Sequence, residues 1–127
     1  LAARFHVERL GDGRFTATGP FYAGNRMQLG PMALLSTGGV RIAVASRKQQ
    51  AADQAMFRHL GVEPREQRIL ALKSSVHFRA DFEAMSSAVL IVAAPGANPV
   101  DHRDLPYRNL RPGLRLMPKG PAFGGDL

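Results

Sequence analysis

The stretch 32-MALLSTGGVRIAVA-45 contains two apolar runs separated by Thr37 and a pair of glycines. Gly38 and Gly39 can adopt the positive φ angles that a tight hairpin turn requires. In the second run, β-branched apolar residues occupy alternate positions, which indicates a strand with one buried face. The stretch therefore predicts an antiparallel β-hairpin.

Two more segments are predicted before and after this hairpin. Residues 14–18 follow a Gly-Asp-Gly turn signal and suit a short strand. Residues 49–60 have helical propensity and carry one apolar stripe, formed by Ala52, Met56, Phe57 and Leu60. Gly61 follows directly and is suited to end this helix in the left-handed conformation.

Residues 68–93 predict a strand, a helix and a second strand. The runs 68–72 and 88–93 are short and apolar without alternation, which is typical of strands covered on both faces. Between them, residues 76–87 carry Phe78, Phe82 and Met85 at helical spacing. We therefore expect an α/β fold with a mixed sheet. In it, a β-hairpin precedes a βαβ unit, helices pack on the sheet, and the C-terminal arm is irregular.

Length and composition limit the class of protein. A chain of 127 residues suits one compact domain, which we place at 1–112, followed by an extended or disordered tail at 113–127. The absence of cysteine excludes a disulfide scaffold and a thiolate metal site, and it fits a cytoplasmic location. No apolar run approaches the roughly 20 residues of a membrane helix, so no membrane partner is expected.

The charge is +7, with 17 basic and 10 acidic residues. This charge allows nucleic acid, an anionic ligand or an acidic protein partner. The arginines are scattered singly, which disfavours nucleic acid. The four histidines are not spaced as a metal pair on one element, and the cluster 101–104 is expected to be solvated rather than ligating, so no metal site is expected in this chain.

One stretch is suited to holding an anion. Lys73, Ser74 and Ser75 come at the end of a predicted strand and the start of a predicted helix, with His77 and Arg79 in the next turn. Helix starts offer free backbone N–H groups, and the cationic side chains add charge, so these residues form a candidate carboxylate or phosphate site. The alternative is an ordinary serine N-cap beside a lysine at the solvent edge.

Several segments in combination resemble one family. They are DGRF at 12–15, GNRMQLGPMALLSTGGVRIAVASRKQQAADQAMFRHLGVEP at 24–64, RILALKSSVHFRADFE at 68–83, APG at 94–96 and LPYRNLRP at 105–112. Together they are similar to the C-terminal domain of the MlrC-type, microcystinase C-like metallopeptidases.

The resemblance implies a two-domain zinc enzyme that hydrolyses short peptides or related amides. The zinc ligands of that family lie in an N-terminal domain, so this chain is expected to hold no catalytic residue and no cofactor of its own. Its expected partners are the N-terminal catalytic domain and a peptide-like or carboxylate-bearing substrate, with residues 73–79 facing the cleft. An uncovered apolar patch would also let the chain pair with itself. The alternative is an autonomous basic module that binds anions or an acidic protein, and nucleic-acid binding is less favoured.

Overall fold

The computed structural model describes residues 3–94, 99 and 101–124 of the chain. The chain divides into two compact units, residues 1–89 and residues 90–127. Each unit is described by itself.

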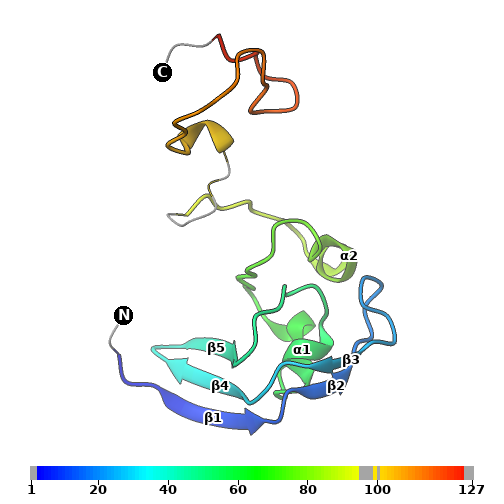
Figure 1. The fold of residues 1–127 in the computed structure, drawn as a ribbon. Helices are drawn as coiled ribbons and strands as arrows, with labels where there is room; N and C mark the ends of the chain where they lie inside the picture. Colours follow the sequence, from blue (N-terminus) through cyan, green and yellow to red (C-terminus); the bar gives the residue numbers. More distant parts are fainter. Residues whose placement is uncertain (1–2, 95–98, 100, 125–127) are drawn as a thin grey trace. The chain divides into compact units, whose positions relative to one another are not determined.

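The first unit is built on two antiparallel sheets (Figure 1). Strands β1 (His6–Gly11), β4 (Met32–Thr37) and β5 (Val40–Ala45) form one sheet in the order β1-β4-β5. Strands β2 (Arg14–Thr16) and β3 (Arg26–Gln28) form the second sheet. The sequence-based prediction of a small α/β domain is confirmed.

The predicted hairpin is formed by β4 and β5. Thr37 pairs with Val40 across the turn, and the register continues to Met32 opposite Ala45. Gly38 and Gly39 have φ angles of 53° and 81°, which residues with a Cβ rarely adopt. The glycine pair therefore fixes the turn and, with it, the register of the sheet.

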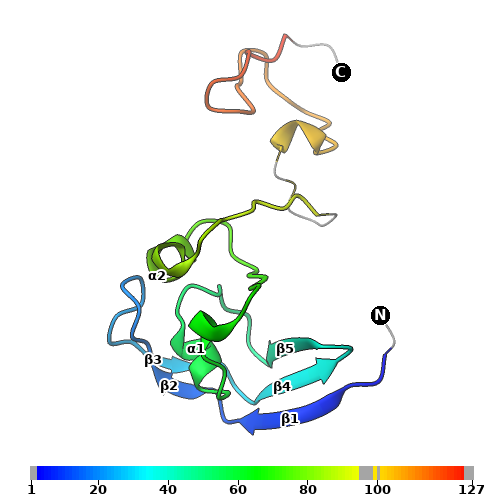
Figure 2. The ribbon, with the colours of Figure 1, turned by 180° about the vertical axis from the view of Figure 1, so that it is seen from behind.

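The core lies between the sheets and the single-turn helix α1 (Ala55–Arg58), which contacts β2 (Figure 2). Its buried members are apolar side chains from β3, from β4, from the helical region and from the segments next to these elements. They are Ala17, Met27, Leu29, Met32, Leu34, Met56, Leu60 and Val62. The apolar stripe predicted for residues 49–60 thus supplies Met56 and Leu60 to this core.

Helix α1 is shorter than the predicted helix over 49–60. Residues before it use their polar groups in tertiary contacts: the carboxyl of Asp53 accepts from the amides of Gly19 and Ala55, both at 2.8 Å. Gln54 binds Asp81 through its backbone and side chain. These contacts override helical propensity. Gly61 ends the helical segment at φ 75°, as predicted.

The βαβ unit is the part in which the structure differs from the expectation. Its helix exists as α2 (Arg79–Phe82), followed by the 3₁₀ turn Glu83–Met85. The runs 68–72 and 88–93 are not strands, and every ladder among the described residues is antiparallel. The physical reason is the lack of a neighbouring strand, since a strand needs a partner for its backbone groups.

The second unit is irregular, as predicted for the C-terminal arm. It contains a 3₁₀ turn, His102–Asp104, and a small loop closed by the backbone bonds Gly113 N to Phe123 O and Phe123 N to Leu114 O, both 2.8 Å. The end of the predicted tail, residues 125–127, lies outside the described residues. No helix in the described part of the chain is long and apolar enough to cross a membrane.

Candidate functional site

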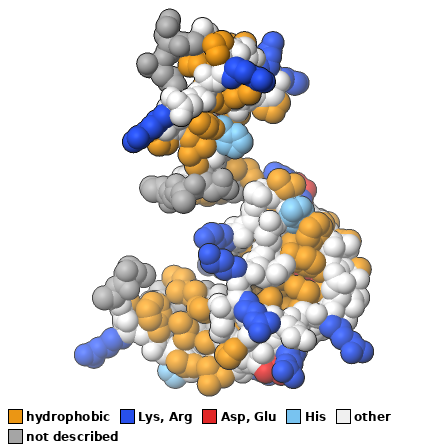
Figure 3. Space-filling model, viewed as in Figure 1, with side chains coloured by type: hydrophobic (Ala, Val, Ile, Leu, Met, Phe, Trp, Pro, Cys, Tyr) orange, Lys and Arg blue, Asp and Glu red, His pale blue; other side chains and the backbone are white. Residues whose placement is uncertain are grey.

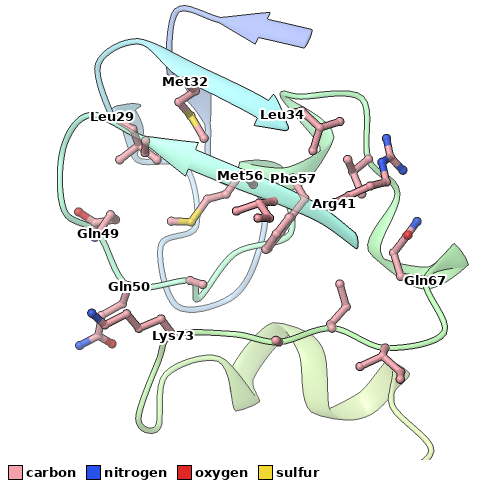
Figure 4. Close-up of a pocket in the computed structure, with 18 of the residues that line it drawn as sticks. Leu29, Met32, Leu34, Arg41, Gln49, Gln50, Met56, Phe57, Gln67 and Lys73 are labelled. Atoms are coloured by element: carbon pink, nitrogen blue, oxygen red, sulfur yellow. The ribbon is translucent and has the colours of Figure 1, made fainter. Parts of the chain in front are cut away.

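The first unit contains an open groove of about 1730 Å³. One wall is β5 with the segment that follows it, and the other is the segment 66–73 (Figure 4). Core side chains close its base, namely Leu29, Met32, Leu34, Met56, Phe57 and Val62. Figure 3 shows hydrophobic side chains gathered over the region of β4 and β5, with basic side chains at the border.

The rim of the groove is strongly basic. Its lining includes five cationic side chains and one carboxylate, Glu66. The cations are Arg41, Arg47, Lys48, Arg68 and Lys73. Arg41 is paired with Glu8 at 3.0 Å. The excess of positive charge over an apolar base favours a ligand or segment that is apolar in part and negatively charged in part.

Two of the five predicted site residues line this groove. His77 is half-buried; its ring stacks on Phe21, with centroids 4.1 Å apart at 23°, and its Nδ1 bonds the side chain of Gln50. Lys73 is exposed and has no hydrogen-bond or ion-pair partner among the described residues. The structure therefore offers one positioned imidazole and one uncommitted ammonium group.

The other three predicted residues are not in the lining of the groove. The Ser74 hydroxyl accepts from the amide of Phe78 at 3.3 Å, so it caps the turn before α2, and Ser75 is exposed. Arg79 pairs with Glu83, one turn further along the helix. Because α2 has only four residues, its dipole adds little, and any anion affinity here would come from side-chain charge.

Sequence reasoning missed the polar residues that line the groove together with Lys73. Arg47, Lys48, Gln49 and Gln50 follow β5 directly and line the same space. The segment is fixed by backbone bonds, including Arg47 N to Leu29 O at 3.0 Å. A signal was present, because this polar run begins where the alternation of β5 stops.

The clearest pKa shifts lie outside the groove. The hydrogen bond from Arg58 lowers the pKa of Glu63, and the hydrogen bond from Arg103 lowers the pKa of Asp101 to about 2. Asp101 also caps the turn His102–Asp104 by accepting from the Arg103 amide at 2.9 Å. Both carboxylates are therefore committed to local ion pairs.

The donor groups of the described residues do not form a set that suits a metal ion. Within residues 3–94, 99 and 101–124, no three His, Asp or Glu side chains come together in a group that could hold one. Structural and catalytic zinc sites need three or four such ligands. We therefore assign no metal ion to the groove.

Comparison with known proteins places the chain in a family. The family model described as "MlrC C-terminus" matches residues 1–109. The chain belongs to the MlrC C-terminus family. The resemblance found in the sequence is thereby confirmed.

The chain is similar to parts of two longer proteins. Microcystinase C from Sphingomonas sp. is 38% identical over 79 residues, which are 62% of this chain and 16% of that protein. A crystal structure of a candidate metallopeptidase from Mesorhizobium sp. BNC1 superposes with a TM-score of 0.72 and 25% identity, over 85% of this chain and 22% of that one. The chain thus spans about a fifth or less of the length of these relatives.

Proposed function

We propose that this MlrC C-terminus is the non-catalytic C-terminal domain of a zinc-dependent peptide or amide hydrolase that acts in the cytoplasm. In this proposal, the segment that carries Lys73 and His77 completes the substrate cleft and holds a carboxylate of the substrate. The supporting observation is that Lys73 lines a groove with an apolar base and lacks an ion-pair partner among the described residues.

The chemistry of the two side chains suits this role. An ammonium group donates up to three hydrogen bonds to carboxylate oxygens, and charge-assisted bonds are about twice as strong as neutral ones. The stacking of His77 on Phe21 fixes the orientation of its imidazole ring. The backbone that connects the two residues is held by the bond between Ser74 and the Phe78 amide.

The zinc ion belongs, in this proposal, to the N-terminal portion that the longer relatives possess. A bound zinc ion supplies an activated water for hydrolysis. The residues of the present chain bind and orient the substrate, and they exclude water from the apolar side of the cleft.

Removal of Lys73 tests this role in the full-length enzyme. With a short peptide substrate, Lys73→Ala should raise KM at least about tenfold, because one charge-assisted hydrogen bond contributes about 1.5–3 kcal/mol. With the same peptide as its C-terminal carboxamide, the two enzymes should differ by less than about twofold. His77→Phe, which retains the stacking on Phe21, should produce a smaller rise in KM.

Lys119→Ala is the matched control, since Lys119 is an exposed lysine of the second unit and lies outside the groove lining. Unchanged kinetics for both Lys73→Ala and His77→Phe, or an equal loss with the acid and the carboxamide, would contradict the proposed contact.

A further inference from the structure

The two walls of the groove are main-chain edges and not side-chain faces. Successive residues of a strand point to opposite faces of the sheet. The groove is nevertheless lined by consecutive residues on both sides, 39–43 at β5 and 66–71 opposite. A space bordered by successive residues on both sides therefore runs along the backbone of β5 and of the segment opposite it.

Both edges lack a neighbour in the described part of the chain. Strand β5 is the last strand of its sheet, in the order β1-β4-β5. Opposite it, no backbone group of residues 68–72 bonds to another described backbone group. Proteins usually protect such edges, because unpaired N–H and C=O groups readily pair with another strand.

Residues 68–72 are mostly apolar, yet this segment is exposed to solvent. The run Arg-Ile-Leu-Ala-Leu has the pattern of a strand covered on both faces, yet Ile69 is 87% exposed. The run 88–93 has the same character, with Leu90 85% and Val92 77% exposed. An apolar segment that is already extended, unpaired and exposed is expected to have a partner outside the described residues.

The dimensions and charge of the groove define the occupant. Its volume of about 1730 Å³ exceeds the roughly 300–1,000 Å³ of small-molecule pockets. The base is apolar, while the rim carries five cations and one carboxylate. A peptide strand with apolar side chains toward the base and acidic residues near the rim satisfies both surfaces.

We propose that this groove receives a β-strand from the N-terminal portion of the polypeptide, which pairs through its backbone with residues 68–72. The inference rests on the proposed function, in which the chain is one domain of a longer enzyme. The length of the relatives argues for this source, because the chain covers only 22% and 16% of them. Pairing here would also bring the N-terminal portion next to Lys73, at the end of the same segment.

Amide hydrogen exchange tests the pairing directly. We would compare this chain alone with a polypeptide in which the N-terminal portion of microcystinase C precedes it. The amides of residues 69–72 should exchange rapidly in the chain alone and at least about 100-fold more slowly in the longer polypeptide. Amides of β4, which are paired in both cases, serve as the internal reference.

Two matched substitutions extend the test. Ile69→Asp should leave the stability of the chain alone unchanged but should abolish the added protection in the longer polypeptide, because a carboxylate would be buried without a partner. Leu10→Asp is the control: Leu10 is also exposed, at 74%, but it lies on β1 and does not line the groove. It should leave the protection of residues 69–72 intact.

Equally rapid exchange in both polypeptides would overturn the inference. Protection that appears in the chain alone and increases with its concentration would also overturn it, since the occupant would then be a second copy. Exchange is measured without substrate, so this result is independent of the proposed role of Lys73. If Lys73→Ala raises KM but residues 69–72 are not protected in the longer polypeptide, the proposed function stands and only the proposed strand pairing is rejected.

Discussion

Replacement of Gly13 by alanine should destabilise the chain by at least about 3 kcal/mol, and urea denaturation of the purified chain should measure the loss. A Cβ at Gly13 would lie 2.0 Å from the carbonyl oxygen of Gly30, and the φ angle of 70° is itself unfavourable for alanine. The backbone cannot move aside easily. The Gly13 amide donates to His59 Nε2 at 3.1 Å, and its carbonyl accepts from Leu29 N at 2.9 Å.

Gly24→Ala is a control that isolates the steric clash. Gly24 has nearly the same φ angle, 77°, but a Cβ there would meet no atom within 4 Å. Its replacement should lower the free energy of unfolding only by the cost of placing alanine in a left-handed backbone conformation, about 1–2 kcal/mol. Equal destabilisation by the two substitutions would show that the close approach of the Gly13 and Gly30 backbones adds no cost beyond that of the left-handed conformation.

Replacement of Asp53 by alanine should be the second large perturbation, at about 3 kcal/mol or more. Asp53 is fully buried, and its two carboxyl oxygens accept from the amides of Gly19 and Ala55, which are buried as well. The substitution leaves two buried N–H groups without an acceptor, at about 1–3 kcal/mol each. It also disconnects the loop at Gly19 from α1. Thermal unfolding followed by circular dichroism would measure the effect.

Asp12 provides a matched comparison, because it makes the same kind of local bond in an exposed position. Its Oδ1 accepts from the Arg14 amide at 2.9 Å, as Asp53 accepts from Ala55, but its side chain is 66% exposed. Water can replace the lost acceptor, so Asp12→Ala should cost less than about 1 kcal/mol. A similar loss at both positions would contradict the importance of burial at Asp53.

The features that were predicted correctly from the sequence are those that local interactions determine, such as turns and helix ends. The Gly38-Gly39 pair and the alternation after it predicted the β4–β5 hairpin, because turn geometry and pleat are local properties. Gly61 ended the helical segment for the same reason. The helix over 49–60 was predicted too long because Asp53 and Gln54 bond to Gly19 and Asp81, which are 34 and 27 residues away in the sequence.

The groove could not be predicted in the same way, since its walls come from two segments that the sequence separates. Lys73 and His77 were predicted as site residues from the chemistry of one segment. Arg47 and Gln50 face the same groove from the other segment, and only the tertiary structure brings the two together. The runs 68–72 and 88–93 carry the pattern of buried strands. That pattern is typical of a strand that pairs with neighbours inside a sheet, and no such neighbouring strand occurs among the described residues.

In the proposed function, this chain is a non-catalytic domain, and the metal chemistry lies in the rest of the polypeptide. Calorimetric titration of the purified, chelator-treated chain with Zn²⁺ at neutral pH tests it most directly. We predict no stoichiometric binding with a Kd below about 1 µM, whereas the polypeptide that includes an N-terminal portion should bind zinc tightly. Tight one-to-one binding by the 127-residue chain alone would contradict the proposed function, because the chain would then hold a metal site of its own.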